Sequence, residues 1–232
     1  MKYWCEDSAV LTHYYNALSV LFPAWEELFC KVAGSYKDSV DSELRSDIDK
    51  FIKQEQSHAN AHHSHNKRYD LLAEETLHRV RAEVLAKRPK NRFVLGAMVS
   101  IEHMAASLGR DFLDRYSNQA SKEYKLFAWH SREEIEHKAL AYNVFKAIGG
   151  SKETLHRAAK TNLRTVVMFI LKHVASKITE EKLWHKPSTW IDLGRLSSRL
   201  VTSLVIPYFT IFTDSFDPEN IDDSKYLQYN KA

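Results

Sequence analysis

The chain has 232 residues, enough for one large or two small domains with a substantial core. It carries 33 Lys and Arg against 30 Asp and Glu, and this nearly balanced charge argues against a nucleic-acid partner. Two cysteines, Cys5 and Cys30, are too few for a disulfide scaffold or a thiolate metal cluster and fit a reducing cytoplasm. The most apolar stretch, residues 200–212, is shorter than the ~20 residues that span a bilayer. We therefore expect a soluble, cytoplasmic protein.

Helix signals follow one another along the first half of the chain. Pro23 predicts a helix start, and apolar residues then recur at helical spacing as far as Gly34. Asp41 or Ser42 predicts the N-cap of a second long helix, which runs through residue 72. A charged segment up to Pro89 is expected to be helical too, with Glu75 and Arg79 spaced for an ion pair.

The second half continues in the same way. We expect an apolar helix over residues 92–109 and another over 121–148 that Gly149 and Gly150 end. Ser151 predicts the cap of a fifth helix, and Ser188 or Thr189 that of a sixth, which Pro207 kinks or ends. No long stretch alternates with period two, so the sequence predicts an all-α fold.

Charge divides the chain into two parts. Residues 151–200 hold ten basic and four acidic residues, whereas residues 201–232 hold two and five. We therefore expect a helical bundle domain over residues 1–150. A basic helical extension with an acidic tail, residues 151–232, is expected to pack on it.

Histidines and glutamates recur at spacings that place them on one helix face, because residues three or four apart are neighbours there. His130, Glu134 and His137 form one such set, and Glu55 and His58 form another. Two further glutamates, Glu26 and Glu102, interrupt apolar stretches of two other helices. The order along the chain is therefore Glu, Glu-x-x-His, Glu and Glu-x-x-His.

This order is that of the dinuclear site of ferritin-like bundles, with one Glu from each of two helices and a Glu-x-x-His pair from each of the others. Four carboxylates would balance two divalent cations, and imidazoles suit iron, manganese or zinc better than calcium. We expect a ferritin-like four-helix bundle with additional C-terminal helices. Its expected metal ligands are Glu26, Glu55, His58, Glu102, His130, Glu134 and His137, and His62 shares their face as a further ligand or as a cavity residue.

Some neighbouring positions compete with these ligands or support them. Glu26 is preferred over Glu27, and Glu134 over Glu133, because only Glu134 stands three residues before His137. We expect Glu133 to accept a hydrogen bond from the non-ligating nitrogen of His58, and Gln54 to play a weaker version of that role towards His137. His103 is expected to face away from the site, and His63 and His65 to be solvated.

The same stretches resemble the bacterial family of predicted metal-dependent hydrolases. Its pattern is FP-x-G-E-x-F-F, Q-E-x-x-H-x-x-x-H-x-x-x-N, E-H-x-T-A and W-H-x-x-E-E-x-E-H-K. This chain has FPAWEELF, QEQSHANAHHSHN, EHMAA and WHSREEIEHK. It departs at Trp25, where the family tends to have Gly, and at Ala105, where it tends to have Thr; both departures are expected to reshape a substrate pocket. The ligand pattern also resembles that of the di-iron arylamine N-oxygenases, which implies the seven ligands given above.

Sites of this composition commonly serve oxygen chemistry, so we expect a non-haem di-iron oxidase or oxygenase. It would use two Fe ions (alternatively Mn or Zn), O2 as co-substrate and an external electron donor to oxidise a small organic or lipid-like substrate. The seven ligands would also be its catalytic residues. The alternatives are a dinuclear metal-dependent hydrolase, in which two metals activate water, and an iron-binding or storage protein.

The segment of residues 160–177 combines an apolar stripe with basic residues. We expect it to pack on the bundle or to form a homodimer interface. The alternative is a helix lying on a membrane surface, which would make the protein membrane-peripheral.

Overall fold

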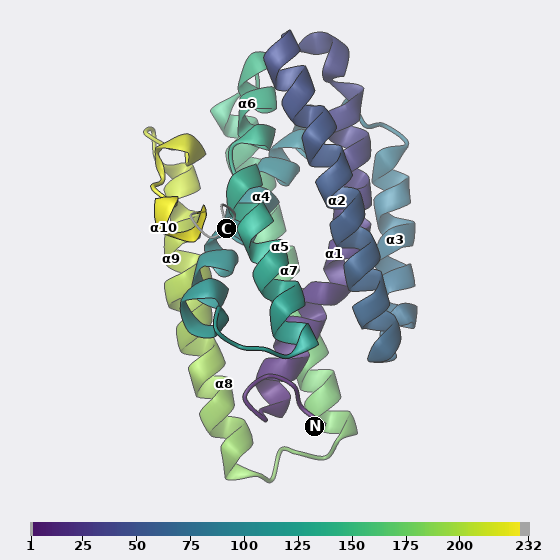
Figure 1. Ribbon diagram of the computed structural model, residues 1–232, viewed down its shortest axis with the longest axis vertical. Helices are drawn as coiled ribbons and strands as arrows, with labels where there is room; N and C mark the ends of the chain where they lie inside the picture. The colour runs from purple at the N-terminus through teal and green to yellow at the C-terminus, as the bar shows by residue number, and fades with distance from the viewer. Residues whose placement is uncertain (1, 228–232) are drawn as a thin grey trace.

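The computed structural model of the chain describes residues 2–227, and these form helices and no strands. The four longest helices before residue 150 are α1 (Ala9–Ser35), α2 (Ser42–Arg68), α4 (Arg92–Tyr116) and α5 (Lys122–His137). α1 packs along α2, α4 packs along α5, and the two pairs face each other (Figure 1). The all-α helical bundle predicted from the sequence is confirmed, while its ferritin-like character stays a prediction.

The remaining elements surround this bundle. α3 (Leu72–Ala86) packs on α1, and α6 (Leu140–Ala147) packs on α4. α7 (Lys152–Glu180) lies along α4 and α1. The chain then runs back along one edge of the molecule, opposite α3 (Figure 1). This C-terminal part consists of α8 (Pro187–Leu200), the π-helical segment η2 (Val201–Val205), α9 (Ile206–Tyr208), η3 (Phe209–Phe212), η4 (Pro218–Asn220) and α10 (Ser224–Leu227). Near the N-terminus, a short η1 (Lys37–Ser39) joins α1 to α2. The domain boundary at residue 150 stays a prediction.

Side-chain caps explain why most of the long helices start where they do. An oxygen in the side chain before the first turn accepts a hydrogen bond from a backbone N–H that has no partner inside the helix. Asp41 caps α2 in this way and Ser151 caps α7, both as predicted. Ser8, Asn91 and Ser121 cap α1, α4 and α5. The expected cap at Ser188 or Thr189 is wrong, because α8 begins with Pro187 and Lys186 occupies the cap position.

Pro23 lies inside α1 and does not start it, so the predicted helix start is wrong. A proline has no N–H to donate to the carbonyl four residues earlier, here that of Ser19. The side-chain amide of Asn66 donates to this carbonyl instead, at 2.9 Å. A residue of α2 thus replaces the hydrogen bond that Pro23 cannot make, and α1 continues past the proline to Glu26.

Two other helix ends differ from the prediction. α4 passes through Gly109 to Tyr116, because this glycine serves close packing between helices: a Cβ at Gly109 would lie 3.0 Å from the carbonyl oxygen of Ser131 on α5. The helix expected over residues 121–148 is interrupted after His137 and resumes as α6. Its predicted end is confirmed, with Gly149 at a φ of 69°.

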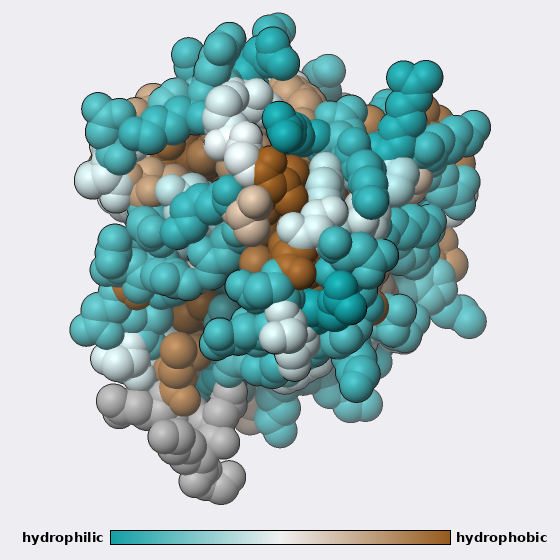
Figure 2. All heavy atoms as spheres, turned by 90° about the horizontal axis from the view of Figure 1, so that it is seen from above, coloured by the Kyte–Doolittle hydropathy of each residue, from teal (hydrophilic) through white to brown (hydrophobic). Residues whose placement is uncertain are grey.

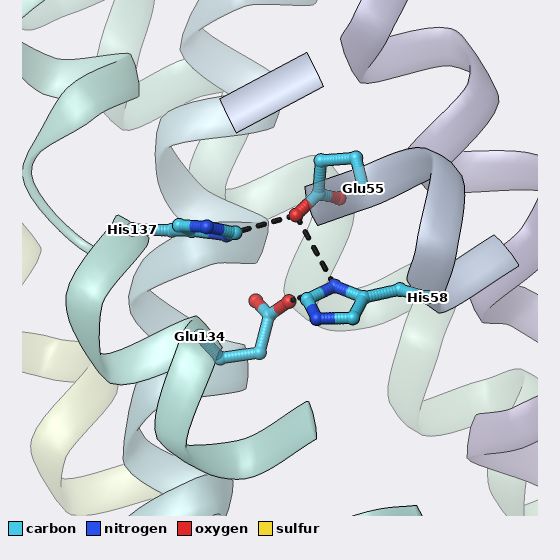
Figure 3. A group of neighbouring side chains, drawn as sticks. All are labelled: Glu55, His58, Glu134 and His137. Carbon is cyan, nitrogen blue, oxygen red and sulfur yellow. Dashed lines mark ion pairs between the residues drawn. The ribbon is translucent and has the colours of Figure 1, made fainter. Parts of the chain in front are cut away.

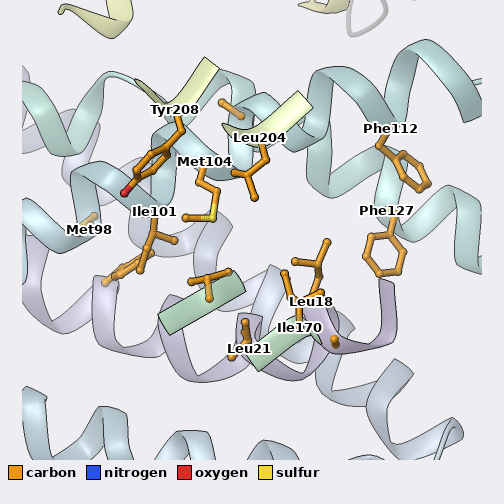
Figure 4. Close-up of a cluster of buried hydrophobic side chains, with 14 of the residues drawn as sticks. Leu18, Leu21, Met98, Ile101, Met104, Phe112, Phe127, Ile170, Leu204 and Tyr208 are labelled. Atoms are coloured by element: carbon orange, nitrogen blue, oxygen red, sulfur yellow. The ribbon is translucent and has the colours of Figure 1, made fainter. Parts of the chain in front are cut away.

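One hydrophobic core joins the bundle to α7 and the C-terminal segment. Leu18 and Leu21 of α1, Met98, Ile101 and Met104 of α4, Phe127 of α5, Ile170 of α7 and Leu204 of η2 converge in it (Figure 4). Burying each large apolar side chain contributes about 1.5–3 kcal/mol. The buried face of α7 includes Val166, Ile170 and Val174, so α7 packs on the bundle through its apolar side chains.

The acidic tail is attached to the bundle by Asp223, which is 3% exposed. Both of its oxygens accept hydrogen bonds from Arg110, at 2.6 and 2.8 Å, and Lys138 also donates to it. Lys138 directly follows His137, so the tail is fixed next to the end of α5.

The outer surface is mostly polar at the end of the molecule where α6 lies, with a small hydrophobic strip at its centre (Figure 2). None of the helices formed by residues 2–227 is long and apolar enough to cross a membrane.

Candidate metal centre

All seven predicted ligands are buried inside the bundle, and none is more than 6% exposed. They come from four helices. α1 contributes Glu26, α2 contributes Glu55 and His58, α4 contributes Glu102, and α5 contributes His130, Glu134 and His137. Residues more than 100 positions apart in the sequence therefore meet in one interior region.

Two overlapping groups of ligand atoms lie within 4.8 Å of one another. The first contains Glu55, His58, Glu134 and His137 (Figure 3). In it, Oε1 of Glu55 lies 2.8 Å from Nδ1 of His137 and 3.4 Å from Nδ1 of His58. The second group contains Glu26, His58 and His130, and His58 thus belongs to both.

Glu102 belongs to neither compact group, although it is 1% exposed. Burial, followed by the charges of Glu134, Glu55 and Glu26, raises its pKa well above the ordinary value for a glutamate. Glu102 therefore lies within electrostatic reach of the other three carboxylates.

Several buried polar atoms of the site have no hydrogen-bond partner within the described part of the chain. They are both carboxylate oxygens of Glu26, Oε1 of Glu55, Oε2 of Glu102 and the Nδ1 atoms of His58 and His137. Leaving such atoms unpaired in a protein interior costs about 1–3 kcal/mol each, and more for a charged group. Divalent cations among these oxygen and nitrogen atoms would satisfy them, so the residues fit a metal centre of the iron, manganese or zinc type.

The carboxylates of the metal-free site cannot all be ionised together. Burial, followed by the charge of Glu55, raises the pKa of Glu26 well above its ordinary value and that of Glu134 to about 7. Burial also acts against ionisation of Glu55, but the close imidazoles of His137 and His58 outweigh it and lower the pKa of Glu55 to about 2. Protons thus offset part of the negative charge, and bound cations would displace them.

Outer partners fix the orientation of two imidazoles. Nε2 of His58 donates to the carboxylate of Glu133 at 2.8 Å, and Nε2 of His137 donates to the amide oxygen of Gln54 at 3.1 Å. Both contacts are those expected from the sequence. Nδ1 of each ring therefore faces the centre, where its lone pair could bind a metal ion once the ring is neutral.

We expect Glu133→Ala to weaken metal binding by about 10–100-fold, the usual effect of removing such an outer partner. His58 would lose the group that holds its ring and its tautomer. Equilibrium dialysis with Mn(II) or Zn(II) would measure the change. Glu136→Ala removes an exposed acid from the same helix and serves as the control; equal losses in both variants would contradict this role for Glu133.

A chain of hydrogen bonds orients the third imidazole, that of His130. Its Nδ1 lies 2.7 Å from Nε2 of His62, whose Nδ1 lies 2.9 Å from the hydroxyl of Ser19. The Ser19 hydroxyl donates to Asn66 at 2.7 Å, and the Asn66 amide donates to Glu75 at 2.9 Å. If each group donates to the next, starting at His130 and ending at the carboxylate of Glu75, every donor in the chain meets an acceptor. Nε2 of His130 is then free to face Glu134, 2.8 Å away.

His62 therefore lies behind His130 and contacts this imidazole, not the carboxylates. Sequence reasoning gave Ser19, Asn66 and Glu75 no role in the site. The signal available for Asn66 was its spacing of four residues from His62 on one helix face.

Comparisons with known proteins place the chain in a family. A family model described as a predicted metal-dependent hydrolase matches residues 1–222. The chain belongs to this family. No curated protein and no solved structure matches it.

The two positions at which the chain departs from the pattern of the predicted metal-dependent hydrolases lie in the wall of one cavity. Trp25 and Ala105 both line a small, mainly apolar space, partly open to solvent, that reaches His130 and Glu134. The expectation that both shape a pocket next to the ligands agrees with this placement.

The remaining histidines and the glutamate next to Glu26 lie outside the ligand cluster. Glu27 pairs with Arg79, whereas Glu26 points into the site. His103 faces away, 3.1 Å from the carbonyl oxygen of Pro207, and His63 is exposed. His65 was expected to be solvated, which is wrong: it is 5% exposed and contacts Asn16 at 3.0 Å, because α1 covers this side of α2.

Proposed function

We propose that the buried cluster is a dinuclear metal centre in a ferritin-like bundle, and that the protein is a metal-dependent enzyme. One observation carries this proposal: carboxylates and imidazoles from four helices converge, and several of their buried ligand atoms have no hydrogen-bond partner within the described residues. A purely structural role is a poor alternative, since apolar side chains of similar volume would stabilise the interior at least as well.

The proposed ligands are Glu26, Glu55, His58, Glu102, His130, Glu134 and His137. His62 is a positioning residue for His130 in this proposal, because its Nε2 is engaged by that ring. When bound, two divalent metal ions would supply Lewis acidity towards a water or a substrate, and two Fe ions could in addition supply electrons to O2.

Hydrolysis is the reaction class that the family description supports. An aromatic side chain shields one of the ligands. Phe22 lies against His130, with ring centroids 4.5 Å apart, and helps to keep bulk water from this imidazole. The substrate would be a small ester or a related compound that enters the adjoining cavity.

Oxidation is the second candidate, and the composition of the site favours it. Four glutamates with three histidines form a carboxylate-rich set, which in helical bundles commonly serves O2 chemistry, and the adjoining cavity is lined mainly by apolar side chains. In this case the protein would be a di-iron oxidase or oxygenase that needs an external electron donor.

Anaerobic reconstitution separates these possibilities. Metal-free protein would be loaded with Fe(II) or Zn(II), the bound metal counted, and O2 consumption and esterase activity measured on the same samples. We expect two metal ions per chain. Esterase activity of the zinc form without O2 uptake by the iron form would support hydrolysis, and rapid O2 uptake with a transient optical band would support oxidation. Many more than two iron ions per chain would indicate iron storage, and no bound metal would contradict the proposal.

A further inference from the structure

We propose that a surface groove between α7 and residues 201–212 binds a single amphiphile from solution, with an anionic head group and a hydrocarbon chain. None of the seven proposed metal ligands lines this groove. The proposal is therefore independent of the proposed function.

The groove is large enough for such a molecule. Its volume of about 670 Å³ lies within the range of small-molecule sites, about 300–1,000 Å³. Side chains of α7 form one wall, and Val205 of η2 with Phe209 and Phe212 of η3 form the other. The groove is open to solvent, so a ligand can enter it while the helical bundle stays closed.

Basic side chains line the α7 wall. His156, Lys160 and Arg164 follow one another at intervals of four residues, which places them in a row along one face of the helix. Neither Lys160 nor Arg164 forms an ion pair with a carboxylate of residues 2–227, and no Asp or Glu of that range lines the groove. This wall therefore carries positive charge without a counter-ion, which favours an anionic head group.

Phe212 joins the basic row to the apolar wall. Its ring lies beside that of His156, with centroids 5.3 Å apart, and Nζ of Lys160 lies 5.9 Å from its centroid. An ammonium group is attracted to the face of an aromatic ring at such a distance. The head group of an amphiphile would thus meet Lys160 where charged and apolar surfaces adjoin.

Apolar side chains line the rest of the groove and are poorly covered. Phe209 is 55% exposed and Met168 is 46% exposed, and Leu163 and Val167 lie in the same lining. A hydrocarbon chain between them would remove this apolar surface from water. The hollow shape favours one inserted chain over a flat partner, such as a bilayer surface, which would leave part of the hollow without contacts.

Calorimetric titration of the full chain with dodecanoate, below the concentration at which it forms micelles, tests the proposal. Dodecyltrimethylammonium serves as the counterpart of opposite charge. We expect one dodecanoate to bind per chain, and the cation to bind at least about tenfold more weakly. Metal-free protein and protein loaded with Zn(II), freed of excess zinc, should bind dodecanoate equally, because no proposed metal ligand lines the groove.

A pair of charge reversals tests the basic wall. Lys160→Glu combined with Arg164→Glu should weaken dodecanoate binding by at least about tenfold, because both cations become anions that repel the head group. Lys172→Glu combined with Lys186→Glu makes the same change in net charge at exposed positions outside the groove and should leave binding unchanged.

A second pair of variants tests the apolar wall. Phe209→Ser should weaken dodecanoate binding by about tenfold, since the hydrocarbon chain loses an aromatic contact. Ile191→Ser removes an equally exposed apolar side chain outside the groove and should have no effect. Because Phe209 and Ile191 are more than half exposed, both variants are expected to fold.

Several results would overturn the proposal. Equal binding of both amphiphiles, dodecanoate binding that requires zinc, or binding that neither the charge reversals nor Phe209→Ser weakens would each place the ligand elsewhere. Co-sedimentation with phosphatidylglycerol vesicles, without binding of monomeric dodecanoate, would assign the groove to a membrane surface. A dimer that Phe209→Ser dissociates would assign it to a second copy of the chain. Failure to bind metal, by contrast, would remove the proposed function and leave the groove assignment standing.

Discussion

Glu134→Ala is expected to abolish binding of the metal pair and, with it, enzymatic activity. Glu134 lies between the two groups of ligand atoms: its Oε1 is 2.8 Å from Nε2 of His130 and 3.5 Å from Nδ1 of His58. Its loss would remove one of four carboxylates that balance the charge of two cations. The loss of affinity should exceed the ~10–100-fold expected for an outer partner such as Glu133.

Metal counting after dialysis and calorimetric titration would measure this loss. Glu134→Gln separates charge from shape, since the amide keeps the volume of the side chain but removes the negative charge. We expect it to bind the metal pair almost as poorly as the alanine variant. The fold should survive in both, because the metal-free site gains no net stability from an acid whose pKa is raised. Two firmly bound metal ions in Glu134→Ala would refute its role as a ligand.

Glu102→Gln is expected to stabilise the metal-free protein at high pH while weakening metal binding. Burial, followed by the charges of Glu134, Glu55 and Glu26, raises the pKa of Glu102 well above 4.5. The folded protein thus keeps a proton that the unfolded chain has already released. The free energy of unfolding falls by about 1.4 kcal/mol per pH unit for each such group, from the unfolded pKa up to the folded pKa.

The clearest window for this measurement lies above about pH 7. Burial lowers the pKa of His62 and of His130 well below 6.5, so these rings are neutral there in both states. Glu134, with a pKa of about 7, and His58, with a pKa of about 11, are present in all three proteins compared, so the test is the difference between slopes. Urea unfolding between pH 7 and 9 should show a shallower fall of the unfolding free energy for Glu102→Gln than for the native protein, by up to about 1.4 kcal/mol per pH unit. Glu83→Gln, at an exposed position of α3, is the control. A slope that is the same in all three proteins would contradict the placement of Glu102 beside the other acids.

The helical class and the ligand helices could be predicted because they depend on local spacing. Glu55 with His58, and Glu134 with His137, stand three residues apart, and a helix turns such pairs to one face whatever surrounds them. The same reasoning located Glu133 and Gln54, since each directly precedes a proposed ligand on the adjacent face. These contacts follow from helix geometry and the antiparallel approach of α2 and α5.

Features that depend on tertiary partners could not be predicted in this way. Pro23 reads as a helix start in isolation, and only the amide of Asn66, 43 residues later, makes an interior proline tolerable. Gly109 reads as a helix end, but its missing side chain admits the backbone of α5. His65 carries no local sign of burial, because Trp4 and Asn16, which contact it, are distant in sequence.

A crystal structure of protein loaded with Mn(II) or Fe(II), with anomalous difference maps, tests the central claim most directly. We expect two strong peaks inside the bundle, within bonding distance of Glu55, His58, Glu134 and His137 and of Glu26, Glu102 and His130. A loaded crystal whose only anomalous peaks lie on the protein surface, with these seven side chains contacting one another or water, would contradict it.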